Sequence, residues 1–257
     1  MNGENKPETW DTAFREKGMR RMALTRWLDD QTNYWKYEKY SQEEIDRIIT
    51  AQVVEHDAII MEKIMKFLSA LLDRSVETHD QKAQERHVLE VGVGVGSLTY
   101  RLVPEALKHE YIYHAVDFSS EAREITCNEL RRRRVPLDCI NNIVSGRAEE
   151  LPYEDNSMWL VIWGRFGQHL TEGLHTDNSQ WNKALEETKR VLQPQGYFML
   201  YESLLEFNFQ RKPGLKVGTW LRSQSEYTNA LSPLQLVKSM TAPFMVETYS
   251  IMLFQKP

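Results

Sequence analysis

The sequence contains little of what several functional classes require. Cys127 and Cys139 are the only cysteines and stand apart, so neither a disulfide framework nor a cysteine-rich metal site is expected. No apolar run reaches the roughly 18 residues of a membrane-spanning helix. Acidic side chains outnumber basic ones by 37 to 32, and the net charge of −5 argues against a broad nucleic-acid-binding surface. We therefore expect no metal, no nucleic-acid partner and no membrane partner.

The start of the chain and its one basic run agree with this. Residues 1–7 are polar, carry mixed charge and lack the pattern of a secretory signal, so we expect a soluble, intracellular protein in the cytoplasm. Arginines occupy positions 131–134, at the end of a helix expected to begin near Ser120, where positive charge meets the negative end of the helix dipole. We interpret this run as a solvated helix end and not as an RNA-binding patch.

Three glycines stand at every second position at the end of residues 87–96, which read His-Val-Leu-Glu-Val-Gly-Val-Gly-Val-Gly. The apolar run predicts a short strand, and the residues that follow Ser97 place Leu98 and Leu102 on one face of a helix. Glycine allows close approach of a ligand to the backbone, and the start of a helix exposes amide groups. The segment therefore predicts a nucleoside-binding loop between a strand and a helix.

The spacing of the glycines narrows the class of ligand. The dinucleotide fingerprint Gly-x-Gly-x-x-Gly fails, because Ser97 or Thr99 stands where its third glycine belongs, and no Gly-Lys-Ser/Thr follows for a P-loop. A nicotinamide-dependent reductase is thus disfavoured. The pattern that remains resembles motif I of the class I S-adenosylmethionine-dependent methyltransferases, and it consists of Glu90, Gly92, Gly94 and Gly96.

Three later segments extend this resemblance over about residues 87–205. Asp117 ends an expected strand 21 residues beyond Gly96, where an acid can accept both ribose hydroxyls of an adenosine, or alternatively cap the next helix. Residues 144–163 resemble the stretch that passes the adenine and enters the fourth strand. Residues 191–202 resemble the helix end, Pro-Gly turn and fifth strand, with Gln195 where glycine is commoner.

The resemblance implies a doubly wound, Rossmann-like α/β fold, with a seven-stranded mixed sheet, helices on both faces and the last strand antiparallel. We expect residues 76–257 to form the S-adenosylmethionine-binding methyltransferase domain and residues 1–75 an N-terminal helical extension that packs on the core as a lid. A capping box at residues 41–44 begins a long helix in that extension. Residues 234–240 and 246–254 predict an antiparallel hairpin at the sheet edge.

The implied cofactor is S-adenosyl-L-methionine, which leaves S-adenosyl-L-homocysteine as product. The sulfonium is already an activated methyl donor, so alignment and exclusion of water suffice and no catalytic motif is expected. The expected cofactor-binding residues are Glu90, Gly92, Gly94, Gly96, Asp117, Phe118, Arg147, Ala148, Glu149, Gly164 and Arg165.

Candidates for the acceptor side come from the aromatic N-terminal segment and from the ends of strands four and five. His169, His175 and Glu202 are candidates for a base or for orienting an amine. Aromatic rings can enclose an amine or a flat substrate, although packing of an amphipathic helix explains those near the N-terminus equally well. The expected substrate-binding residues are Trp27, Tyr34, Trp35 and Phe166.

The function we predict is methyl transfer from S-adenosylmethionine to a nitrogen or oxygen of a small-molecule acceptor. Residues 161–171 resemble a stretch of the protein N-terminal amine methyltransferases, so a peptide N-terminal α-amine stays an alternative, although Arg165 and Phe166 replace the Gln-Trp pair of that family. A second alternative is a non-catalytic, methyltransferase-like binding or regulatory subunit. Arg147 and Trp159 leave room for it, because acidic residues are usual at both positions.

Overall fold

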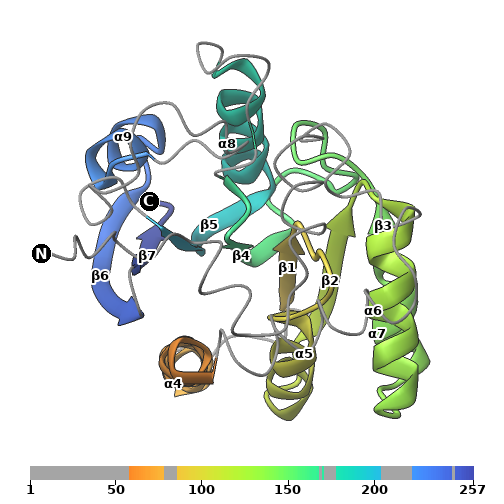
Figure 1. Ribbon diagram of the computed structural model, residues 1–257. Coiled ribbons are helices and arrows are strands. Elements are labelled where there is room, and N and C mark those ends of the chain that lie inside the picture. The colour runs from red at the N-terminus through yellow and green to blue at the C-terminus, as the bar shows by residue number, and fades with distance from the viewer. Residues whose placement is uncertain (1–57, 78–85, 168–169, 171–177, 204–221, 245–246) are drawn as a thin grey trace, which may run out of the picture.

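The computed structural model describes residues 58–77, 86–167, 170, 178–203, 222–244 and 247–257. These residues form a seven-stranded sheet in the order β3-β2-β1-β4-β5-β7-β6 (Figure 1). The strands are β1 (His87–Val91), β2 (Ile112–Asp117), β3 (Ile143–Ser145), β4 (Met158–Gly164), β5 (Leu192–Ser203), β6 (Gln235–Phe244) and β7 (Glu247–Gln255). Strands β1 to β5 pair in parallel, and β7 is antiparallel to both of its neighbours. The mixed sheet and antiparallel last strand are confirmed.

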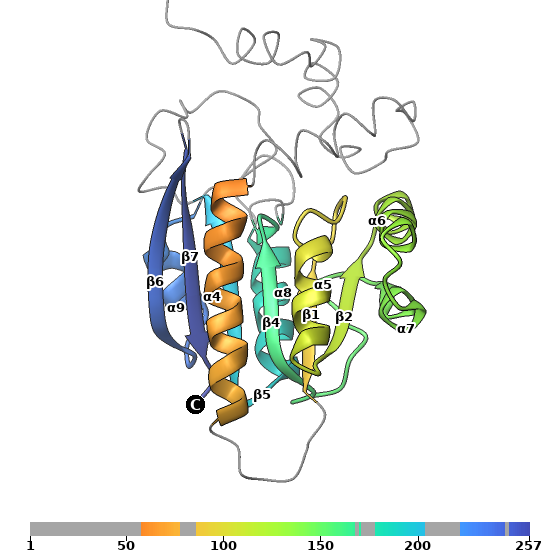
Figure 2. The same ribbon diagram turned by 90° about the horizontal axis from the view of Figure 1, so that it is seen from below.

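Helices cover both faces of this sheet, as predicted. The helices are α4 (Ala58–Glu77), α5 (Thr99–Lys108), α6 (Ser120–Arg132), α7 (Leu137–Asn141), α8 (Ser179–Val191) and α9 (Gln224–Ala230). Side chains of α4, α5, α6 and α7 join one buried cluster, and side chains of α8 and α9 join the cluster on the opposite face. Figures 1 and 2 show α4 and α5 on the face opposite α8 and α9.

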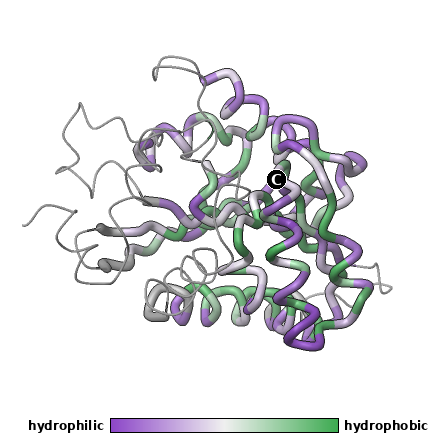
Figure 3. Tube along the Cα trace, turned by 45° about the vertical axis from the view of Figure 1, so that its right-hand side comes forward, coloured by the Kyte–Doolittle hydropathy of each residue, from purple (hydrophilic) through white to green (hydrophobic). Residues whose placement is uncertain are grey.

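The central strands are buried on both faces and so have continuous apolar sequences. In β4, Met-Trp-Leu-Val-Ile-Trp-Gly, every residue except the last is buried, which is the pattern of a strand covered by helices on both sides. The helices instead alternate apolar and polar residues along their turns (Figure 3). Burial of the apolar face against the sheet, at about 25 cal/mol per Å², is what stabilises each helix.

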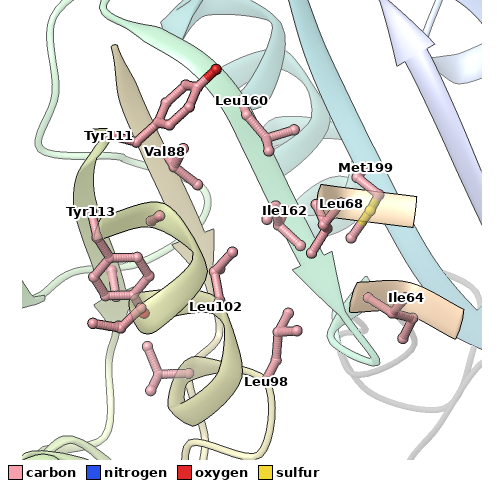
Figure 4. Close-up of a cluster of buried hydrophobic side chains, with 14 of the residues drawn as sticks. Ile64, Leu68, Val88, Leu98, Leu102, Tyr111, Tyr113, Leu160, Ile162 and Met199 are labelled. Carbon is pink, nitrogen blue, oxygen red and sulfur yellow. The ribbon is translucent and has the colours of Figure 1, made fainter. Parts of the chain in front are cut away.

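Helix α4 shows how the apolar period positions an element. Ile64, Leu68 and Leu72 recur every four residues and are completely buried. Figure 4 shows Ile64 and Leu68 beside Ile162 of β4 and Met199 of β5. The expected packing of this helix on the sheet is confirmed. The expected helix start at residues 41–44 lies outside the described residues, as does most of the proposed lid.

Two predicted boundaries differ from the structure. The hairpin at the sheet edge forms, but β6 continues through Ala242 and Pro243 to Phe244, where a turn was expected. An edge strand tolerates proline because the missing amide faces solvent. The Pro-Gly segment is part of β5: the register jumps from Met158↔Leu192 to Leu160↔Tyr197, which makes it an irregularity within the strand.

Gln195 lies in this irregular segment and adopts a left-handed conformation, with φ of 64°. Its amide donates to the Lys256 carbonyl (3.0 Å), and the Lys256 amide donates to Gly196 (2.9 Å), so the conformation is fixed by the chain end. A side chain in this region of φ strains the backbone, which explains why glycine is common in the resembling family.

We expect Gln195→Gly to raise the free energy of unfolding by about 0.5–1 kcal/mol, because relief of the left-handed strain exceeds the entropy that glycine adds to the unfolded chain. Urea unfolding measures this. Gln193→Gly is the matched control: Gln193 has no positive φ, so glycine there should destabilise. A loss of stability in both variants would contradict the strain argument.

No helix among the described residues is long and apolar enough to cross a membrane. The basic run at 131–134 closes α6 as predicted: Arg131 and Arg132 form its last turn and Arg133 its C-cap. Arg133 bonds Glu129 (Nε to Oε1, 2.8 Å), and its guanidinium lies 4.8 Å from the centre of the Tyr100 ring. All four arginines are exposed, so the run forms a solvated helix end.

Candidate functional site

The glycine loop follows β1 at the carboxyl edge of the parallel strands, the edge at which such sheets bind ligands. Gly92, Gly94 and Gly96 all have positive φ, between 56° and 82°. A Cβ on Gly92 would lie 2.3 Å from Cδ2 of Phe166, and one on Gly96 would lie 2.6 Å from Cζ of Tyr100. Backbone conformation and close packing both exclude a side chain at these two positions.

Hydrogen bonds fasten this loop to the neighbouring strand and helix. The Gly92 amide donates to the Val116 carbonyl (2.9 Å), and the Gly94 amide donates to Oδ2 of Asp117 (2.9 Å). Thr126 of α6 donates its hydroxyl to the Gly94 carbonyl (3.0 Å). The loop therefore has a fixed position relative to the end of β2, and Asp117 is part of what fixes it.

Asp117 is 8% exposed and is the last residue of β2. Its Oδ1 accepts the Ser119 amide (2.9 Å), while the cap of α6 is the Ser119 hydroxyl, which accepts the Ala122 amide (3.1 Å). The alternative that Asp117 merely caps the helix therefore does not describe its contacts. Burial raises the pKa of this carboxyl, and the amides of Gly94 and Ser119 oppose that rise. Each oxygen retains acceptor capacity for a ribose hydroxyl.

The residues expected around the adenine lie at the same carboxyl edge of the sheet. Phe118 follows Asp117, and its ring is 54% exposed, which leaves an aromatic face for a flat base. The Gly146 amide donates to the Asp117 carbonyl (3.3 Å), which brings the next turn to this edge. In that turn Ala148 is buried, and Nη2 of Arg147 lies 3.1 Å from Oε1 of Glu149, so these two charges pair with each other.

Glu90 is buried beneath the loop and contacts protein groups. Its Oε2 accepts the hydroxyls of Thr99 (3.0 Å) and Tyr113 (2.7 Å), which joins β1 to the first turn of α5 and to β2. Burial raises the pKa of Glu90 to about 7, partly offset by these two hydrogen bonds. Its expected contact with a cofactor stays a prediction, and its internal contacts hold the walls of the loop in place.

The raised pKa of Glu90 implies a specific pH dependence of stability. The folded carboxyl holds its proton up to about pH 7 and the unfolded one only to about 4.5, so between these values the folded state binds more protons. The stability that the protonated Glu90 carboxyl contributes is complete below the unfolded pKa and is lost as the pH rises to about 7. We expect wild type to lose stability relative to Glu90→Gln between pH 5 and pH 8, measured by urea unfolding. An equal difference at both pH values would contradict this.

The end of β4 brings a second group of expected residues to the glycine loop. Gly164 ends the strand, and Arg165 adopts a left-handed conformation (φ of 57°) while its amide donates to the Tyr201 carbonyl (2.7 Å). The Arg165 guanidinium lies 5.7 Å from the Tyr249 ring centre. Phe166 packs against Gly92 and edge-on against Trp163. Phe166, expected to bind substrate, thus packs against the glycine loop, and its expected contact with a substrate stays a prediction.

Glu202 is 1% exposed and lies beneath this segment. Its Oε1 accepts the Gly167 amide (2.5 Å), while Oε2 is buried and has no hydrogen-bond partner among the described residues. Burial raises the pKa of Glu202 to about 8, against the influence of the Gly167 amide and the positive charges of Arg165 and Arg222. A catalytic role stays a prediction, because the contact seen here is with the protein backbone.

Sequence reasoning missed Gly167, Arg222 and Tyr227, which surround Glu202. Residues 218–227 read as a polar loop and helix start, and nothing in them indicates that Arg222 is 1% exposed and reaches back to the end of β4. Only the folded chain reveals this contact. The remaining expected residues, His169, His175, Trp27, Tyr34 and Trp35, lie outside the described part of the chain.

The sequence of this chain is similar to those of known methyltransferases. Residues 89–200 match the family model of a methyltransferase domain. Over 119 residues the chain is 29% identical to the ubiquinone/menaquinone biosynthesis C-methyltransferase UbiE of Rickettsia prowazekii, a match that covers 45% of this chain and 44% of that protein.

Two solved structures share the fold. The PH0226 protein of Pyrococcus horikoshii aligns with a TM-score of 0.60 at 15% identity, covering 84% of this chain and all of that one (100%). A SAM-dependent methyltransferase of Aquifex aeolicus aligns with a TM-score of 0.54 at 16% identity, covering 84% and 98%. Fold, glycine loop and family match agree. Residues 89–200 are a methyltransferase domain of the class I S-adenosylmethionine-dependent superfamily.

Gly92 offers a direct test of the loop. Gly92→Ala places a methyl group against Phe166 and strains a backbone with φ of 77°, so we expect affinity for S-adenosylhomocysteine to fall at least about tenfold. Calorimetric titration measures this, with Ser97→Ala in the same segment as a control that should bind normally. Unchanged affinity in Gly92→Ala would show that the loop does not contact the cofactor.

Proposed function

We propose that the protein is an S-adenosylmethionine-dependent methyltransferase that acts on a nitrogen or oxygen of a small-molecule acceptor. The observation that carries the proposal is the bond between the Gly94 amide and Asp117. It places the glycine loop beside a buried carboxylate that still has acceptor capacity. The family match over residues 89–200 supports the reaction class.

The residues present fit this cofactor. Asp117 would accept the ribose hydroxyls, the exposed ring of Phe118 would cover the adenine, and the loop at Gly92 would adjoin the methionine part. When bound, the cofactor supplies a methyl group already activated by its sulfonium. Ala148 and the Arg147–Glu149 pair lie at the adenine side of the same edge.

What the chain itself must do is orient the acceptor and exclude water. An amine has to arrive neutral, and a hydroxyl gains nucleophilicity when it loses its proton, so a base near the methyl group would help either one. His169 and His175 are our candidates for that base, together with Glu202. Trp27, Tyr34 and Trp35 are our candidates for an aromatic wall around the acceptor.

Two alternatives make different demands on the same site. A peptide N-terminal amine would need Arg165 and Phe166 to accommodate a peptide, and Phe166 instead packs against Gly92. A non-catalytic subunit would keep the fold and lose turnover. The name of the Rickettsia relative adds carbon as an acceptor atom for the assay to include.

The experiment that tests the cofactor is calorimetric titration with S-adenosylmethionine and S-adenosylhomocysteine. We expect Asp117→Ala to weaken binding at least about tenfold, because it removes both the ribose acceptor and the anchor of the Gly94 amide. Asp138→Ala, which removes an exposed carboxylate on α7, is the matched control and should bind normally. Absence of binding by the intact protein would reject the enzyme assignment.

If the cofactor binds, transfer of a labelled methyl group to amines, phenols, carbon acids and N-terminal peptides identifies the acceptor. Transfer to peptides alone would favour the N-terminal amine methyltransferase. Binding without transfer to any acceptor would favour the non-catalytic subunit.

A further inference from the structure

Two buried charged side chains hold the backbone of Gly167 from opposite sides. The Gly167 amide donates to Oε1 of Glu202 (2.5 Å), and Nη1 of Arg222 donates to the Gly167 carbonyl (2.9 Å). Glu202 and Arg222 are each 1% exposed. Both peptide groups of one glycine, three residues beyond the end of β4, are thus bound by ionisable side chains from distant parts of the chain.

Arg222 also joins this segment to α8. Its Nη2 donates to the Leu170 carbonyl (3.2 Å) and to Oδ1 of Asn178 (3.1 Å), and its guanidinium lies 4.2 Å from the Trp181 ring centre. One side chain therefore contacts the segment at both Gly167 and Leu170, together with the start of α8. We call Glu202, Gly167 and Arg222 the Gly167 clamp.

The clamp is costly if its only role is to hold the fold together. Burial disfavours the charged forms of both Glu202 and Arg222, and apolar residues of similar volume often stabilise a core as well or better. Within the described part of the chain, Oε2 of Glu202 and Nε of Arg222 are buried without hydrogen-bond partners, which adds to the cost. The two hydrogen bonds of the clamp fix the position of Gly167.

Close packing leaves little space around Gly167. A Cβ on Gly167 would lie 2.6 Å from the Tyr227 hydroxyl and 3.3 Å from both Oε1 of Glu202 and Cε3 of Trp163. The segment has no room to move toward α9 or toward the sheet. A shift of Gly167 must move the preceding residue, Phe166, whose ring lies against Gly92 of the glycine loop.

We propose that Glu202 and Arg222 are positioning residues, which hold Gly167 so that Phe166 seats on Gly92 and fixes the cofactor loop on its acceptor side. In this role the clamp acts on the cofactor through Phe166, which is separate from the candidate role of Glu202 as a base. The part of this proposal that concerns cofactor affinity rests on the proposed function. The part that concerns the coupling of Gly167 to Gly92 can be measured without any ligand.

The test compares Glu202→Leu, which removes the acceptor of the Gly167 amide, with Glu202→Gln, which retains one. We expect Glu202→Leu to weaken binding of S-adenosylhomocysteine by about tenfold and Glu202→Gln by less than about threefold, because only the first frees Gly167. In a Phe166→Ala background, Glu202→Leu should have no further effect, since the two act through one contact. A lowered melting temperature with unchanged affinity, or effects that simply multiply, would overturn the proposal.

Hydrogen exchange of the ligand-free protein provides the second readout. Glu202→Leu should speed exchange both at residues 164–167 and at residues 92–96, and Glu202→Gln should leave both segments protected. Faster exchange confined to residues 164–167 would show that the clamp does not reach the glycine loop. Exchange coupling in a protein that binds no S-adenosylhomocysteine would reject the proposed function and leave the coupling intact.

A second pair of variants serves if Glu202→Leu does not fold. Gly167→Ala should disturb the clamp through its clash with the Tyr227 hydroxyl, and Tyr227→Phe, which removes that hydroxyl, should restore protection at residues 92–96 in the double variant. Tyr227→Phe alone is the control and should keep the wild-type exchange pattern. If Gly167→Ala leaves the glycine loop protected, Gly167 does not set its position.

Discussion

The site depends on the hydrogen bond by which the Gly94 amide reaches Asp117. It joins the loop after β1 to the end of β2, and these two strands pair in parallel from His87↔Ile112 to Val91↔Val116. A glycine loop by itself is conformationally free, and its freedom costs entropy on ordering. The buried carboxylate removes that freedom before any ligand arrives, so the loop amides are already arranged.

Two other buried carboxyls, those of Glu90 and Glu202, also hold neighbouring segments by hydrogen bonds. Glu90 accepts two hydroxyls beneath the loop, and Glu202 accepts the Gly167 amide beneath the end of β4. Each carboxyl is deprived of water, so its pKa rises to about 7 and about 8 respectively. A buried carboxyl of this kind costs stability at neutral pH, and hydrogen bonds or a paired charge offset that cost. Here each one bonds a segment that faces the carboxyl edge of the sheet.

Phe166 connects the two halves of the site. Its ring lies on Gly92, while its neighbour Gly167 is held by Glu202 and Arg222. The glycine loop and the segment after β4 therefore share one aromatic contact.

The sequence alone determined the parts that local pattern controls. Apolar runs between glycine-rich turns specified the central strands, and the four-residue period specified α4. The resemblance carried by Gly92, Gly94, Gly96 and Asp117 pointed to the methyltransferase superfamily. Gln195 was recognised as standing at a glycine position, and its φ of 64° agrees. These features are short-range, since backbone sterics and periodic burial act within a few residues.

Tertiary structure alone decided which distant side chains meet. Arg222 lies 55 residues from Gly167 along the chain, and no local pattern marks it as buried or directs it to that carbonyl. The placement of Phe166 on Gly92 likewise follows from the pairing of β4 beside β1. The extent of β6 through Pro243 was decided by its position at the sheet edge. Long-range contacts of this kind depend on how the whole sheet is assembled, because each requires two elements to be in register before it can form.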